Sequence, residues 1–249
     1  MNLTKQILSL IILLVTFKVS AFTIAVNQRA TSNYDTDSLV RDKDSLVALV
    51  PDLIPQKKNG KFGYIDKEGN VIIPHTYSNV SFFSQDCHLL NSTSETVQKF
   101  GSDQYASVRL NGIDYRIDKK GKRVYRFKES DLGTCPIEYK AQRYFSYVRQ
   151  GYYGIIEKDK FINEMDYRQF LIYPQFQYLH VMEGDDINNP MIVAAYDNRF
   201  GVIDIKGNII IPFEYADIKR NFSWKLAHPF EVTRHGQSYY FVDVANNAY

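Results

Sequence analysis

Apolar and polar positions alternate in short runs along most of the chain, and turn-forming residues separate the runs. Residues 62–65 are apolar or aromatic around one Gly, residues 66–70 read Asp-Lys-Glu-Gly-Asn, and residues 71–73 are β-branched. Two apolar runs joined by a short polar segment that contains Gly predict a β-hairpin. We expect Gly69 to take the positive φ that the loop requires. The Asp66 side chain is expected to fix the turn by accepting hydrogen bonds from backbone N–H groups two residues further on.

The hairpin pattern is repeated along the chain. Residues 62–74 align without a gap with residues 200–212, and three looser copies keep the strand and its acidic end. The acidic residues that mark the copies, spaced by about 40 to 50 residues, are Asp66, Asp118, Glu157, Asp204 and Asp243. The predicted turn positions are Asp66, Gly69, Asp118, Gly121, Asp204 and Gly207. Pro74 and Pro212 cannot donate to a ladder, so they are expected to end the second strand of each hairpin.

The repeated hairpins predict an all-β fold. A single hairpin is only marginally stable in water, so the copies are expected to stack and to bury their faces against one another. The 19 Tyr and 16 Phe residues favour half-buried pleated surfaces of this kind. We predict about four to five irregular repeats over residues 51–249, each a hairpin with one or two further strands, such as those near 82–83 and 106–110. The copies are expected to form an open solenoid or a propeller-like array.

These residues resemble a known family. An aromatic residue and Gly, a strand ending in Ile-Asp, a short turn with Gly, an apolar pair and Pro are similar to the WG repeat of many bacterial proteins. The Trp-Gly pair of that family corresponds to Phe62-Gly63, Tyr153-Gly154 and Phe200-Gly201, while the copy at Tyr115 lacks the Gly. The resemblance covers about residues 53–243. It implies an all-β repeat domain with a binding or scaffold role, and it transfers no catalytic residue.

Residues 1–21 have the pattern of a secretory signal peptide. Lys5 precedes an apolar run over residues 7–17, and small residues end the segment at Ala21. The run is shorter than the about 20 apolar residues that span a bilayer. The next residue is Phe22 and not the Cys to which a lipoprotein attaches its lipid. We expect export to a periplasmic or extracellular location, no membrane span after cleavage, and a mobile leader over residues 22–50.

The charge balance argues against a nucleic-acid partner. The chain carries 30 Lys and Arg against 28 Asp and Glu, and the predicted cleavage would remove Lys5 and Lys18, which leaves a net charge near zero. Proteins that bind nucleic acid non-specifically depend on clustered Lys and Arg. The basic run over residues 119–123 is expected to be a solvated turn.

No motif in the sequence identifies a reaction, a cofactor or a metal. The five histidines show no compact ligand spacing. A nucleophile elbow and the glycine-rich phosphate and dinucleotide loops are absent from the sequence. Paired carboxylates could still serve a hydrolase, and the acidic stretch 183–189 could offer oxygen ligands to calcium, although a surface loop is the simpler interpretation. We predict no catalytic, cofactor-binding or metal-binding residue.

Aromatic pairs offer a further candidate surface. Tyr presents a large contact area at low entropic cost, so a binding platform could form from Tyr144, Phe145, Tyr147, Tyr152, Tyr153, Tyr239 and Tyr240. Alternation along a strand buries every second side chain, so a core position is expected for each single residue.

Cys87 and Cys135 are the two cysteines of the chain. They occupy similar places after Asp66 and Asp118 in neighbouring repeats, so they could meet, and an exported protein can keep a disulfide. Our hypothesis is that they are bridged, with two free thiols as the alternative.

The sequence favours a non-catalytic binding module. Repeat arrays present extended surfaces, and function usually lies in the loops that differ between copies. Here these loops are the insertions over residues 83–104, 158–170 and 182–189. We expect another protein to bind there, and an inhibitor or immunity protein of the cell envelope is one version of this function. The alternatives are a carboxylate-dependent hydrolase or a glycan-binding protein acting on cell-wall polysaccharide, and a structural envelope protein.

Overall fold

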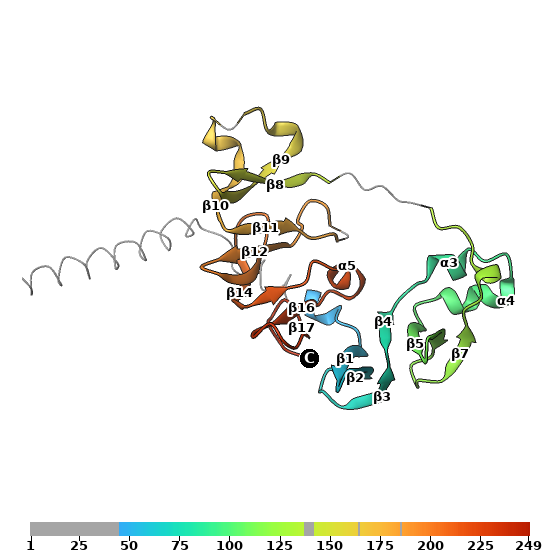
Figure 1. Cartoon of the computed structure of the whole chain (residues 1–249). Coiled ribbons are helices and arrows are strands. Elements are labelled where there is room, and N and C mark those ends of the chain that lie inside the picture. Colours follow the sequence, from blue (N-terminus) through green and yellow to red (C-terminus); the bar gives the residue numbers. More distant parts are fainter. Residues whose placement is uncertain (1–44, 137–141, 164, 185) are drawn as a thin grey trace, which may run out of the picture. The chain divides into compact units, whose positions relative to one another are not determined.

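The computed structural model describes residues 45–136, 142–163, 165–184 and 186–249 (Figure 1). The predicted signal peptide and residues 22–44 of the predicted leader lie outside the described residues. Leu46, Val47 and Val50, at the end of that leader segment, pack against core residues of the repeats. Within the described ranges the chain is mostly β-strand, as predicted.

The strands of the described residues form five small antiparallel sheets, each built from consecutive parts of the chain (Figure 1). The first sheet contains β1 (Ile54–Lys58), β2 (Lys61–Ile65) and β3 (Val71–Tyr77). The second contains β4 (Asn79–Phe83), β5 (Ala106–Leu110), β6 (Ile113–Ile117) and β7 (Arg123–Arg126). The third contains β8 (Tyr144–Arg149), β9 (Tyr152–Glu157) and β10 (Phe170–Phe176). The fourth contains β11 (Tyr178–Val181), β12 (Ile192–Tyr196), β13 (Arg199–Ile203) and β14 (Ile209–Tyr215). The fifth contains β15 (Asp217–Ile218), β16 (Phe230–Thr233) and β17 (Tyr240–Val242).

Short helices lie between the strands. They are α3 (Cys87–Leu90), α4 (Glu95–Gln98) and α5 (Ser223–Ala227), with the 3₁₀ helices η1 (Lys99–Gly101), η2 (Glu129–Asp131), η3 (Lys158–Lys160) and η4 (Tyr167–Gln169). The insertion over residues 83–104 therefore contains three helices and is more than a loop. No helix in the described part of the chain has the length and apolar character needed to cross a membrane.

Each sheet corresponds to one sequence repeat, and each of the first four contains a tight hairpin that the sequence analysis did not predict. The hairpin of β1 and β2 turns at Asn59 and Gly60, whose φ angles of 50° and 77° are both positive, as in a type I′ turn. Residues 111–112, 150–151 and 197–198 form the same two-residue turn in the next three sheets. This turn matches the right-handed twist of the strands that it joins.

The Gly of the aromatic-Gly pair is required by a very close approach of two backbones. A β-carbon at Gly63 would lie 2.4 Å from the Ile73 carbonyl oxygen and 2.8 Å from the His75 nitrogen. At Gly201 a β-carbon would lie 2.7 Å from the Ile211 carbonyl oxygen. No side chain fits at these distances, so Gly is the residue that lets the neighbouring strand cross here.

The prediction that Pro74 and Pro212 end their strands is wrong. β3 continues through Pro74 to Tyr77, and β14 continues through Pro212 to Tyr215. Both prolines lie on an outer strand of their sheet and within a shift of register, where the strand carries extra residues. Since a bulge on an edge strand leaves some N–H groups without a partner strand, Pro is tolerated there.

The second repeat has Tyr115 in place of the Gly, and Arg116 follows at the position that Tyr64 has in the first repeat. Its partner strand β7 is short and lacks the Pro. The Arg116 side chain is buried and donates to the carbonyl oxygens of Ser84, Phe100 and Ser102 at 2.8–2.9 Å. Burial lowers the pKa of this guanidinium, and the three carbonyls replace the water that it loses. Arg116 thereby anchors the 83–104 insertion to the second sheet.

Four apolar clusters in the described residues join the sheets. They lie between the first and second sheets, the third and fourth, the fourth and fifth, and the fifth and first. The cluster between the first and second sheets includes Tyr64 and Val108, and that between the third and fourth includes Ile172 and Ile203. Val202 and Phe230 belong to the cluster between the fourth and fifth sheets. Ile54 and Phe241 belong to the cluster between the fifth and first sheets. The fifth repeat thus packs on the first. Neither the predicted solenoid nor a propeller closure is detected among the described residues.

Replacing Gly201 by Ala should destabilise the protein by about 1–3 kcal/mol, because the added methyl group must displace the backbone at Ile211. Urea unfolding of residues 22–249, followed by circular dichroism, measures the change. Lys61→Ala, at an exposed position in β2, is the control and should alter the free energy of unfolding by less than about 0.5 kcal/mol. Equal stability of the two variants would contradict the close approach.

Arg116→Met should destabilise by about 2–5 kcal/mol, since it removes a charged, buried donor from the carbonyl oxygens of Ser84, Phe100 and Ser102. The same unfolding measurement on Arg126→Met, an exposed position on β7, provides the control. A stability loss no larger than that of the control would exclude Arg116 as the anchor of the insertion.

Candidate functional site

The predicted turn residues form one hydrogen-bonded loop in three repeats. Gly69 N donates to the Asp66 carbonyl oxygen at 3.1 Å, and the Asp66 carboxylate accepts from Asn70 N at 2.7 Å. The loops that begin at Asp118 and Asp204 repeat these contacts. The φ angles are 85° at Gly69, 80° at Gly121 and 85° at Gly207. The carboxylates at these positions are therefore occupied in holding the loops.

The fifth copy keeps this loop, whereas the third replaces it. Asp243 accepts from Asn247 N at 2.9 Å, with Asn246 at a φ of 65° where the other copies have Gly. Glu157 instead binds Lys160 at 2.9 Å and Arg143 at 2.8 Å. Hydrogen bonds from Lys160 and Arg143 lower the pKa of the Glu157 carboxyl. The third repeat departs from the shared loop at this residue, and the 158–170 insertion follows.

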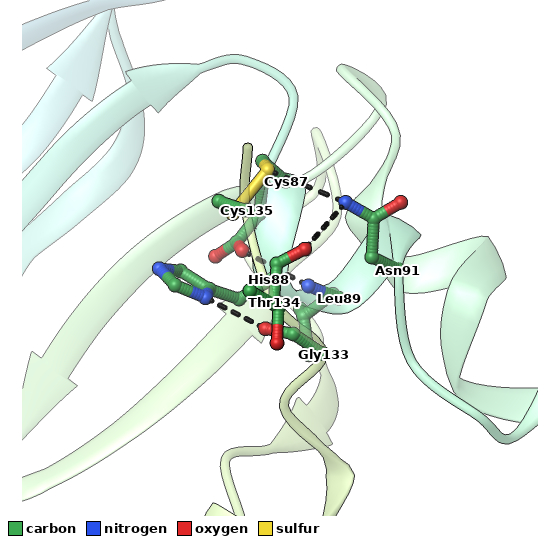
Figure 2. The surroundings of a disulfide bond; sticks show 8 residues. Cys87, His88, Leu89, Asn91, Gly133, Thr134 and Cys135 are labelled. Carbon is green, nitrogen blue, oxygen red and sulfur yellow. Dashed lines mark hydrogen bonds between the residues drawn. A yellow bond between two sulfur atoms is a disulfide. The ribbon is translucent and has the colours of Figure 1, made fainter. Parts of the chain in front are cut away.

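A disulfide joins Cys87 to Cys135 (Figure 2). Cys87 is the first residue of α3, within the 83–104 insertion, and Cys135 lies beyond β7, the last strand of the second sheet. Their Cα atoms are 5.6 Å apart, and 48 positions separate them in the sequence. The bond therefore ties the insertion to the segment that leaves the second repeat.

Hydrogen bonds beside the disulfide join the same two segments (Figure 2). Gly133 N donates to the His88 carbonyl oxygen at 2.8 Å, and Asn91 Nδ2 donates to the Thr134 carbonyl oxygen at 3.0 Å. A β-carbon at Gly133 would lie 1.8 Å from the Asn91 carbonyl oxygen, so this segment lies directly against α3. The predicted binding loop 83–104 is thus a fixed structural part of the second repeat.

The third sheet carries an aromatic cluster on the face that points away from the fourth sheet. Tyr147 of β8 and Phe170 of β10 lie 5.7 Å apart between ring centroids, and Phe161 of the 158–170 insertion contacts both, at 4.9 and 5.7 Å. Tyr173 of β10 extends the cluster at 5.7 Å from Phe170. The insertion therefore folds back over its own sheet.

Large apolar side chains around this cluster reach solvent. Ile162 and Met165 are each 82% exposed, and Tyr167 is 67% exposed. Leu171 and Tyr173, on the strand that follows, are about half exposed. We define these five side chains as the apolar surface. The 158–170 loop was predicted as a binding loop, but these residues were not; apolar residues in an otherwise polar insertion are the sequence signal that points to them.

The third insertion lines a cavity of about 720 Å³. Other walls come from residues 142–146, from the end of β11 and from residues 220–222. Charged side chains in the wall already have partners, such as Lys225 with Glu183 at 3.1 Å and Arg220 with Asp217 at 2.7 Å. The volume lies within the range of about 300–1,000 Å³ that ligand pockets have.

The carboxylates in this wall are engaged in structural contacts. Asp186 accepts from Asn188 N at 2.9 Å and from the Asn189 side chain at 3.0 Å. These bonds, that from the Asn189 side chain first, lower the pKa of Asp186. A general acid at neutral pH requires a raised pKa, so Asp186 does not suit that role. In the described parts of the chain, no group of three or more His, Cys, Asp and Glu could hold a metal ion.

Removing the disulfide by Cys87→Ser with Cys135→Ser should destabilise the protein by about 4 kcal/mol in the chain-entropy account of a loop of this length. Urea unfolding of the double variant and of the oxidised wild type measures the loss. The wild type should also resist alkylation by iodoacetamide until it is reduced, and two alkylated thiols without reductant would contradict the bridge.

Comparison with protein families finds the WG containing repeat at residues 62–87 and 200–223. Comparisons with curated proteins and with solved structures find no match. The two matched segments begin at Phe62 and Phe200, the aromatic residues of the pairs whose Gly lies under the crossing strand. The chain therefore carries WG containing repeats at these two places.

Proposed function

We propose that this chain is an exported module that binds another protein through the apolar surface of its third repeat, and that it acts by binding and not by catalysis. The partner is expected in the periplasm or outside the cell. This proposal keeps the protein partner that the sequence favours, and it selects the 158–170 insertion among the three candidate loops.

The observation that carries the proposal is the exposure of the apolar surface. Soluble monomers rarely leave several large apolar side chains exposed together, and such patches mark sites of contact with proteins or membranes. Aromatic residues and Met are enriched at protein interfaces. Met165, Tyr167 and Tyr173 are of these types, and Tyr173 packs against Phe170 of the aromatic cluster.

Two features support export. The first 21 residues have the pattern of a signal peptide. The disulfide between Cys87 and Cys135 is of the kind that persists in oxidising compartments and is rare in the cytosol.

The test is a capture experiment with a triple variant. Tagged residues 22–249 are incubated with envelope extract and culture medium of the producing cells, and the retained proteins are quantified by mass spectrometry. Ile162→Asp with Met165→Asp and Tyr167→Asp should reduce recovery of the partner at least about tenfold, because loss of a hot-spot residue at an interface costs about 2 kcal/mol or more.

The matched control places the same three charges on exposed apolar residues of other sheets, through Val71→Asp, Ile72→Asp and Ile209→Asp. It should retain the partner at the level of the wild type. Equal recovery by the wild type and the apolar-surface variant, or recovery of no stoichiometric partner, would refute the proposal.

A further inference from the structure

Among the described residues, the third sheet lacks a strand that three other sheets have. In the second, fourth and fifth sheets, the strand that starts the hairpin is flanked by one more antiparallel strand, namely β4 on β5, β11 on β12 and β15 on β16. In the first and third sheets, β1 and β8 form the edge among the described residues. These two edges differ in one residue that decides whether a strand can add.

Ser146 of β8 corresponds to Pro55 of β1 and to Val193 of β12. In each sheet this residue lies three positions before the strand residue that closes the two-residue turn. In the third sheet that closing residue is Arg149, which pairs with Tyr152 across the turn. In the fourth sheet, Val193 is paired with His180 of the added strand. In the first sheet, Pro55 has no N–H to offer, which protects the edge. Ser146 offers its N–H.

The backbone of Ser146 points to the open edge. Arg149 and Tyr152 flank a two-residue turn, so they form a hydrogen-bonded pair. Such pairs alternate in an antiparallel ladder, so the N–H and C=O groups of Tyr144 and Ser146 face away from β9. The bond from Lys158 N to the Arg143 carbonyl oxygen, at 3.0 Å, fits this alternation. No further strand of the described chain pairs with these groups.

This open edge faces the cavity. Tyr144, Phe145 and Ser146 all line it, and consecutive residues of a strand line one cavity when the edge of the strand points into it. The cavity wall also contains Phe222 and Ile187, which are about half exposed. The cavity wall therefore offers both backbone groups that can bind another strand and an apolar surface that can contact a side chain of that strand.

We propose that this cavity is the docking site of an extended peptide from a partner protein, which adds to β8 as an antiparallel strand. The outward N–H and C=O groups of Tyr144 and Ser146 are spaced by about 6.7 Å along the strand. The backbone of another extended chain has the same spacing. The peptide residue opposite Ser146 takes the place that His180 has on β12, and an apolar side chain contacts Phe222. These residues are distinct from the apolar surface, so the inference does not depend on the proposed function.

The test uses linear twelve-residue peptides selected from a random library on residues 22–249. Affinity of the best peptide is measured by fluorescence anisotropy for the wild type, Ser146→Pro and Ser146→Ala. Ser146→Pro should weaken binding at least about tenfold, because it removes the donor and leaves a buried peptide carbonyl without a partner. Ser146→Ala keeps the N–H and should bind within about twofold of the wild type.

The fold should accept Ser146→Pro, since Pro55 occupies the corresponding place in β1, and an unchanged circular dichroism spectrum checks this. Two versions of the peptide are N-methylated, one at the odd and one at the even positions. Only the version that loses the N–H groups facing β8 should lose binding. The triple variant of the apolar surface should bind the peptide like the wild type. Selection of no peptide, equal affinity of Ser146→Pro, or binding of cell-wall oligosaccharides in place of peptides would overturn the proposal.

Discussion

The close crossing of two backbones at a glycine is the constraint on which the repeat depends. At Gly63, Gly154 and Gly201 the bulged partner strand passes where a β-carbon would otherwise lie. The bulge lets a seven-residue strand bend around its hairpin. The strand ends in Tyr77, Phe176 and Tyr215 respectively, and each of these aromatic side chains is buried in a cluster between sheets. The glycine and the sheet-to-sheet packing are thus parts of one arrangement.

The strands and loops of the repeat were predictable, because both follow from local rules. The polar run from Asp66 to Gly69 between apolar runs is a turn by its own chemistry. Pro74 was misinterpreted, since the sequence does not show that its strand lies at a sheet edge. The Asn59-Gly60 pair is a strong hairpin signal that was overlooked. The helices of the first insertion were missed because segments of three or four residues have no apolar period to detect.

The candidate surfaces depend on relations between sheets, which a single sequence reveals poorly. The exposed Ile162 and Met165 lie in an insertion that the sequence analysis did identify, but their exposure depends on which face of the third sheet the fourth sheet covers. The open edge at Ser146 is visible only when β8 is compared with β1 and β12. Its signal in the sequence, a Ser where the first repeat has Pro, has no meaning until the registers are known.

The packing of the fifth sheet on the first has a consequence for biogenesis. Ile54 and Ile65 belong to the first repeat to leave the ribosome, and their partners Ala227 and Phe241 belong to the last. The cluster on this face of the first sheet is therefore incomplete until the residues up to Phe241 have been synthesised. Contacts between such distant segments form slowly. Until those contacts form, the waiting apolar face is the part of the chain most exposed to aggregation.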